Sequence, residues 1–220
     1  MALQPIEGQP GLFRDTDSGQ VVNIRDFRES DKYDTLVIPA NTLITAGTEL
    51  EFFANLQGKY NLDTNFKTMR KLSAGESMVL DRIGISFRNA IGDSVSYPRD
   101  MKKIVDNAYF RLNINDILQD EGPAIKFPSG YGLYGQTTEN DAGIVSVGVP
   151  ATASASRLVK KQMLNQNHEI SGIMSFQSRA WTAANNGSGL GTVTVVQPTL
   201  DNPIMVTCYL HGLVRAAVTK

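Results

Sequence analysis

Apolar and polar residues alternate in short segments from residue 35 onward, a pattern typical of β-strands with one buried face. In residues 48–54, Leu50 and Phe52 alternate with Glu49 and Glu51. The segments that we expect to form strands are residues 35–38, 48–54, 76–88, 109–115, 143–149, 168–177, 191–197 and 203–218. Residues 157–166 form either a further strand, which we favour, or a short helix. This pattern predicts a chain of about eight strands.

Long connections rich in Gly, Pro and Asn separate these segments, and the strongest helix candidate is the short stretch 99–107. No strand–helix–strand rhythm is present, so a parallel α/β sheet is not expected. Short strands joined by long crossing loops favour a jelly-roll or Greek-key sandwich. The predicted fold is therefore an all-β sandwich with one or two short helices.

Residues 1–34 lack this alternation and contain seven acidic and four basic residues, a charge of about −3. We interpret them as an extended N-terminal arm, with a disordered tail as the alternative, and residues 35–220 as a single β-sandwich domain. The apolar residues of the arm are the predicted assembly interface with a neighbouring subunit. They are Leu12, Phe13, Val21, Val22, Ile24 and Phe27. Deleting residues 1–34 is expected to leave a folded monomer that does not assemble.

The inventory of reactive side chains is small. The 220 residues include one cysteine, Cys208, and two histidines, His168 and His211. An intrachain disulfide and a cysteine-based zinc site are therefore excluded. We expect no catalytic residues, no cofactor and no metal, and we predict that the protein is not an enzyme.

The charges nearly cancel, since 21 Lys and Arg stand against 22 Asp and Glu for a net charge of −1. This balance argues against a large basic surface for nucleic acid or an anionic membrane. Direct binding of nucleic acid is not expected. Three short basic clusters are better suited to ion pairs at a subunit interface. They are Lys67, Arg70 and Lys71; Arg99, Lys102 and Lys103; and Arg157, Lys160 and Lys161.

Two local motifs resemble ligand-binding loops, but the residues around or within them do not fit such a site. Residues 130–135 match G-x-G-x-x-G, but no strand precedes them and no amphipathic helix follows, as a dinucleotide site requires. Counted from Asp15, positions six and twelve of a calcium loop hold Gln20 and Asp26 instead of Gly and Glu. Neither motif supports a ligand site.

Residues 1–20 have no basic start and no apolar run, so we expect no signal peptide. No stretch approaches 18 apolar residues, so no transmembrane segment is expected. Synthesis in the cytoplasm is the corresponding expectation.

The loops offer a second interpretation. A tryptophan in a loop can serve as a platform for a sugar ring, and aromatic and amide side chains would have to gather beside it. The candidate residues of such a ligand or partner loop are Tyr131, Tyr134, Trp181, Asn185 and Asn186. They define the alternative function, a carbohydrate- or receptor-binding β-sandwich of the phage-fibre or lectin kind. A cupin-type enzyme ranks last, because two histidines without an H-x-H motif supply few metal ligands.

A polar arm, the strands at 35–38 and 48–54, the polar excursion through residues 61–65, and the closing segment 206–215 occur together in this order. This layout resembles viral jelly-roll capsid proteins, particularly the single-jelly-roll shell proteins of tailless icosahedral phages. The resemblance implies a virion protein that self-assembles into an icosahedral capsid shell. It also implies a homo-oligomer that contacts other virion proteins or an internal membrane. The acidic arm differs from the basic, genome-binding arm of many capsid proteins, so we expect it to contact protein.

Overall fold

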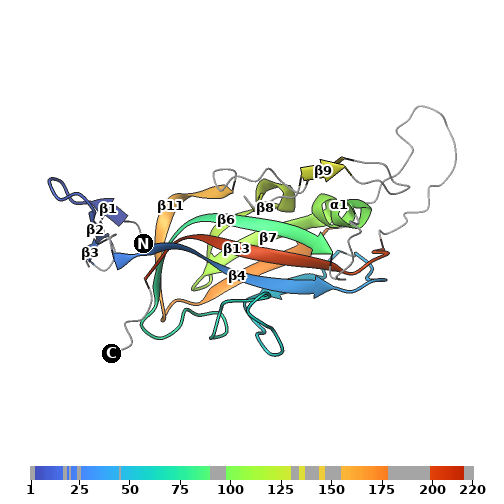
Figure 1. The fold of residues 1–220 in the computed structure, drawn as a ribbon, viewed down its shortest axis with the longest axis horizontal. Coiled ribbons are helices and arrows are strands. Elements are labelled where there is room, and N and C mark those ends of the chain that lie inside the picture. Colours follow the sequence, from blue (N-terminus) through green and yellow to red (C-terminus); the bar gives the residue numbers. More distant parts are fainter. Residues whose placement is uncertain are drawn as a thin grey trace.

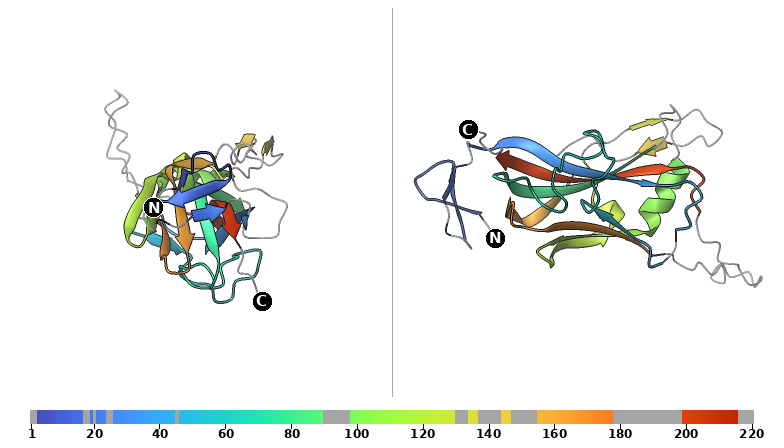
Figure 2. Two further views of the ribbon diagram at one scale, coloured as in Figure 1. Left: turned by 90° about the vertical axis from the view of Figure 1, so that its left-hand side faces the viewer. Right: turned by 90° about the horizontal axis from the view of Figure 1, so that it is seen from below.

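The structure is a computed structural model that describes residues 3–16, 19, 21–23, 26–44, 46–89, 98–129, 134–136, 144–146, 155–177 and 199–215. Two four-stranded antiparallel sheets pack face to face in an elongated sandwich (Figure 1). The two layers are seen edge-on in the right-hand view of Figure 2. The predicted all-β sandwich is confirmed.

The first sheet has the strand order β11-β6-β13-β4. Its strands are β4 (Arg28–Ile38), β6 (Ser77–Asn89), β11 (Ser156–Asn165) and β13 (Ile204–Arg215). The second sheet has the order β5-β12-β7-β8. Its strands are β5 (Glu49–Phe52), β7 (Ala108–Ile114), β8 (Ile117–Pro123) and β12 (Ile170–Phe176).

The pairing of these strands is nested along the chain. β4 pairs with β13, β5 with β12, β6 with β11, and β7 with β8, all antiparallel. The first of the eight strands thus lies beside the last, the second beside the seventh, and so on inward to the central hairpin. Each of the outer pairs brings together residues that are far apart in the sequence.

Apolar side chains from both sheets fill the space between them. Phe52, Phe110 and Phe127 are fully buried there. The rings of Phe110 and Phe127 meet edge to face at 5.2 Å, and those of Phe52 and Phe110 do so at 6.2 Å. Such contacts add stability beyond the burial of apolar area. The space between the two sheets is therefore filled by one hydrophobic core.

The start of β4 corrects the predicted domain boundary. Residues 28–34, assigned from sequence to the arm, form the first part of β4 and pair with β13. Two of their charged side chains are buried against residues far along the chain: Lys32 pairs with Glu76 at 2.6 Å, and Asp34 with Lys59 at 2.7 Å. The sandwich therefore begins at Arg28. Deleting residues 1–34 would remove the first part of the edge strand β4, so the expected folded monomer requires a deletion that ends before Arg28.

The residues before Arg28 include a small sheet of their own. β1 (Leu3–Pro5), β2 (Leu12–Asp15) and β3 (Val21–Asn23) form an antiparallel three-stranded sheet. It lies beyond one end of the sandwich (Figures 1 and 2). This part of the chain is a folded meander and not an extended arm.

The remaining elements lie mainly at the other end (Figure 1). Helix α1 (Pro98–Asn107) matches the predicted helix, and η2 (Ala124–Lys126) is a short 3₁₀ turn after β8. β9 (Tyr134–Gln136) pairs with β10 (Ile144–Ser146), the central part of the predicted strand at 143–149. The predicted strand at 191–197 lies outside the described residues. β8 was not predicted, because its sequence ILQDEGP does not alternate.

Candidate interaction surface

The structure places the predicted assembly residues of the arm near the body of their own chain. Leu12, Val21 and Val22 line a groove of about 450 Å³ that also touches Met163 and Arg215 of the sandwich. Val22 is only 6% exposed, so it packs within its own subunit instead of being offered to a neighbour. Of the other three, Phe13 and Phe27 are half-buried, and Ile24 lies outside the described residues.

The predicted ligand loop falls mostly outside the described part of the chain. Tyr131, Trp181, Asn185 and Asn186 are not among the described residues. Tyr134 belongs to β9, where the backbone alone is described. The proximity of these five residues, on which the carbohydrate-binding interpretation depends, stays a prediction.

The histidines and the cysteine occupy structural positions. The ring Nδ1 of His168 accepts a 3.0 Å hydrogen bond from the backbone N–H of Asn165 and so caps the turn between β11 and β12. His211 Nδ1 lies 2.9 Å from a carboxylate oxygen of Asp31 on the neighbouring strand β4. Cys208 is fully buried, and this burial, with a smaller effect from Asp34, raises the pKa of its thiol well above the ordinary value.

A groove of about 620 Å³ opens beside His211, between β4, β6 and β11. It is lined by both signs of charge, among them Asp31, Asp81, Arg82 and Lys161. Within the part of the chain that the structure describes, no three His, Cys, Asp or Glu residues are grouped so that they would hold a metal ion. No described helix has the length and hydropathy needed to cross a bilayer.

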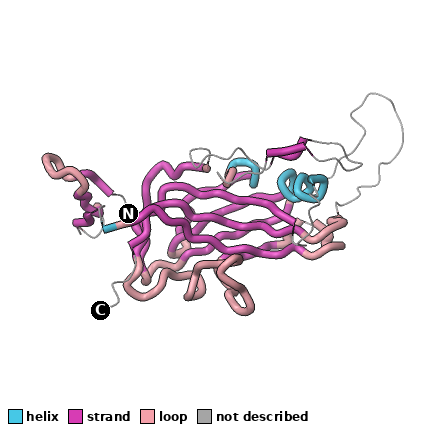
Figure 3. The backbone as a smooth tube through the Cα atoms, in the orientation of Figure 1, coloured by secondary structure: helices cyan, strands magenta, loops and turns pink. Residues whose placement is uncertain are grey.

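The most distinctive surface feature is the segment 55–70, which we call the projecting loop. It extends from one long side of the sandwich, below the sheets in Figure 3, where loops are pink. Tyr60 and Leu62 at its tip are 79% and 81% exposed, and Met69 nearer its base is also exposed. Large apolar side chains so accessible to water are typical of surfaces that bind a partner.

Residues in the second half of the loop bind the open side of β4. The backbone N–H of Tyr33 donates to the side-chain carbonyl of Asn65 at 2.9 Å, and the Asn65 amide donates to the carbonyl of Asp31 at 2.7 Å. The Thr64 hydroxyl donates to the carbonyl of Tyr33 at 3.0 Å. The loop therefore satisfies backbone groups that an edge strand would otherwise expose to another chain.

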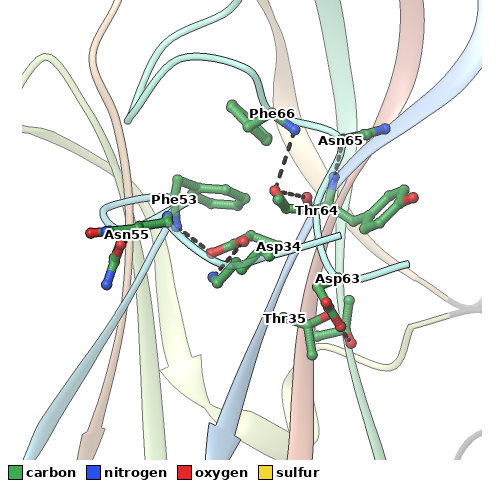
Figure 4. Close-up of polar contacts among 12 residues, drawn as sticks. Asp34, Thr35, Phe53, Asn55, Asp63, Thr64, Asn65 and Phe66 are labelled. Carbon is green, nitrogen blue, oxygen red and sulfur yellow. Dashed lines mark hydrogen bonds and ion pairs between the residues drawn. The ribbon is translucent and has the colours of Figure 1, made fainter. Parts of the chain in front are cut away.

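A buried carboxylate anchors the first half of the loop (Figure 4). Asp34, on β4, accepts hydrogen bonds from the backbone N–H of Phe53 and from the Lys59 ammonium, each at 2.7 Å. The side chain of Asp34 is completely buried, and that of Lys59 is 16% exposed. An ion pair in these surroundings is screened little by salt and fixes the position of both residues.

Contacts at the tip and the base complete the framework of the loop. At the tip, the Tyr60 N–H donates to the Asp63 carboxylate at 3.1 Å, and the Asp63 N–H donates back to the Tyr60 carbonyl at 2.9 Å. At the base, Arg70 pairs with Glu169 at 3.0 Å and Glu51 at 2.5 Å. Hydrogen bonds to these two carboxylates raise the pKa of Arg70, so it stays charged. Tyr60 and Leu62 are thus displayed on a preorganised loop.

From the sequence alone, residues 55–70 are predicted to be a polar connection between strands, and neither Tyr60 nor Leu62 is a candidate site residue. The signal present was two large apolar residues inside an otherwise polar, Asn- and Asp-rich stretch. Pattern alone does not say whether such residues point inward or outward. The exposure of the two side chains settles this, since they are 79% and 81% accessible to water.

Comparison with known proteins adds no relative. No protein-family model matches the chain, no curated protein is similar to it in sequence, and no solved structure matches its fold.

Proposed function

We propose that this protein is a structural subunit that self-assembles into an icosahedral virion shell, with the projecting loop as one of its contact surfaces. The observation that carries the proposal is the display of Tyr60 and Leu62, 79% and 81% exposed, on a loop that hydrogen bonds hold against β4. A preorganised loop loses little conformational entropy on binding, so its exposed apolar side chains contribute more of their burial free energy to association. Aromatic residues such as Tyr60 are common anchors of protein interfaces.

The strand pairing supports the shell class. Eight strands in two four-stranded sheets, paired first with last and inward to a central hairpin, are the arrangement expected of a jelly roll. Jelly rolls occur in viral capsids, lectins and cupins, so the fold by itself does not choose among these functions. Within this group, the exposed apolar side chains of the projecting loop favour association with a protein partner.

The test measures assembly of the purified full-length chain by sedimentation velocity and electron microscopy. We expect closed particles or large oligomers. The variant Tyr60→Ser/Leu62→Ser should keep the wild-type melting temperature, because neither side chain packs in the core, yet need at least about tenfold more protein to assemble. Leu43→Ser, which also removes an exposed leucine but at the β-bridge to Thr199 and outside the loop, is the matched control and should assemble normally.

Two outcomes would overturn the proposal. A wild-type chain that stays monomeric at all concentrations and binds immobilised glycans would favour the carbohydrate-binding alternative. Normal particles from the Tyr60→Ser/Leu62→Ser variant would remove the projecting loop from the contact surfaces.

A further inference from the structure

Strand β11 forms one of the two edges of the first sheet, and its pairing with β6 is interrupted by a large β-bulge. Arg157 lies opposite Arg82 of β6, whereas Gln162 lies opposite Leu80, so four residues of β11 face the single residue Asp81. Of the four residues 158–161, Leu158 is buried and the other three are exposed. Val159, in the middle of the bulge, is completely exposed at 102%. Bulges of this kind are found at sheet edges, where they alter how a strand meets other chains.

The bulge carries an excess of positive charge. Arg157, Lys160 and Lys161 are all exposed there. The carboxylate of Asp81 lies 3.5 Å from the Lys161 ammonium and 3.7 Å from the Arg157 guanidinium, and it also pairs with Arg82 at 3.3 Å. One carboxylate beside three cations leaves the edge basic, with Val159 at its centre.

The outermost strand of the second sheet, β8, has the opposite charge. Asp116, Asp120 and Glu121 lie in or beside it, and Lys126, paired with Asp120, is the cation that partly offsets them. Two apolar side chains, Ile117 and Leu118, are 65% and 47% exposed next to these acids. This edge therefore combines an acidic character with exposed aliphatic surface.

The two edges belong to one side of the sandwich, the upper side in Figure 1. After β8 the chain crosses directly to β6, where the Ile85 N–H donates to the Phe127 carbonyl at 2.8 Å and Ile85 bridges to Pro128. β11 occupies this same edge of β6 along Ser77–Ile83. Within the described residues, neither β8 nor β11 has a further strand on its outer edge.

We propose that this side is a two-fold interface between copies of the chain, in which the basic bulge of β11 meets the acidic β8 edge of the second copy. A two-fold axis presents the same surface twice, so each copy supplies one basic edge and one acidic edge, and both contacts form together. Val159 then packs against Ile117 and Leu118 of the partner. The inference rests on the proposed function, because it names one contact through which the subunit associates.

The experiment exploits the two-fold symmetry through two charge-reversal variants of the full chain. Variant one, Lys160→Glu/Lys161→Glu, makes both edges of a copy acidic. Variant two, Glu121→Lys/Asp116→Asn, makes both edges basic. Each variant by itself sets like charge against like charge at both contacts, and we expect its dimer to be about 100-fold weaker than that of the wild type. An equimolar mixture restores opposite charges at both contacts, so a mixed dimer should form with near wild-type affinity.

Native mass spectrometry distinguishes the mixed dimer from both self-dimers, and sedimentation at low and high salt measures affinity. Lys102→Glu, a reversal on the exposed face of α1, is the matched control and should leave the dimer unchanged. Val159→Ser, at a side chain without packing contacts in its own subunit, should weaken the dimer without altering the melting temperature.

The outcomes separate the two proposals. If the wild type assembles and both variants assemble equally well by themselves, or if mixing restores nothing, the β8–β11 interface is wrong and the assembly function stands. If the wild type does not associate under any condition, the proposed function itself fails.

Discussion

The carboxylate of Asp34 accepts a 2.7 Å hydrogen bond from the backbone N–H of Phe53, across the two sheets of the sandwich. Asp34 lies in β4 of the first sheet, and Phe53 follows β5 of the second. Phe53 has a φ of 67°, a left-handed conformation that non-glycine residues rarely adopt. The hydrogen bond stabilises this turn, from which the projecting loop departs.

Breaking this contact should destabilise the whole sandwich. Asp34→Asn keeps the size of the side chain but removes the charge that Lys59 faces, and we expect unfolding to become easier by about 3 kcal/mol. Chemical denaturation followed by circular dichroism measures this change. In a double-mutant cycle, adding Lys59→Met should cost less in the Asp34→Asn background than in the wild type. Equal costs in both backgrounds would contradict a coupled buried pair.

Two glycines should respond differently to the same substitution. A Cβ added at Gly212, at the bulge between β13 and β6, would lie 2.0 Å from the carbonyl oxygen of Val79. The atoms nearest to a Cβ at Gly172 belong to the side-chain rings of Phe53 and Phe110, at 3.2 and 3.4 Å. Because backbone cannot shift as side chains can, Gly212→Ala should lower stability by more than about 3 kcal/mol and Gly172→Ala by about 1. Thermal melts of both variants check the order, and a reversed order would refute it.

Acid should weaken the attachment of α1 through Asp100. Burial by itself raises the pKa of Asp100, but hydrogen bonds from Lys103, the Asp201 N–H and Asn202 outweigh it and hold the pKa below the ordinary 3.8. A carboxyl whose pKa is lower in the folded state contributes its full stability above its unfolded pKa and loses it as pH falls through the folded value. We therefore expect the free energy of unfolding to decrease as the pH is lowered below about 4.

The variant Asp100→Asn tests this assignment. It should cost about 2 kcal/mol at pH 7 and reduce the loss of stability on acidification. Asp106→Asn is the control, since Asp106 forms an exposed ion pair with Lys102 on the same helix. If both variants had identical acid profiles, Asp100 would not be the titrating group.

Cys208 should be protected from thiol reagents in the folded protein. It is fully buried opposite Asp34 in the β4–β13 pair, and burial raises the pKa of its thiol well above the ordinary value. At pH 8 we expect alkylation at least about 100-fold slower than in urea-unfolded protein, because the thiolate is both scarce and inaccessible. Mass spectrometry after a timed pulse of iodoacetamide measures the rate. Rapid labelling of the native chain would place the thiol near the surface.

The sequence by itself determined the elements whose cause is local. β7 and β12 alternate between buried and half-buried positions along their whole length. That period of two is visible in the residues themselves. The buried position of Cys208 was predicted for the same reason. Local periodicity was enough to identify an all-β sandwich.

The tertiary structure decided where charged strands and polar loops belong. Residues 28–34 have the composition of a solvated arm, yet they form part of β4 because Lys59 and Glu76, far along the chain, neutralise Asp34 and Lys32. The outward display of Tyr60 and Leu62 likewise depends on hydrogen bonds between the projecting loop and β4. Burying a charged side chain is unfavourable unless an oppositely charged partner lies beside it. Here the partners are distant in the sequence, so they become neighbours only when the chain has folded. No pattern within either segment contains that information.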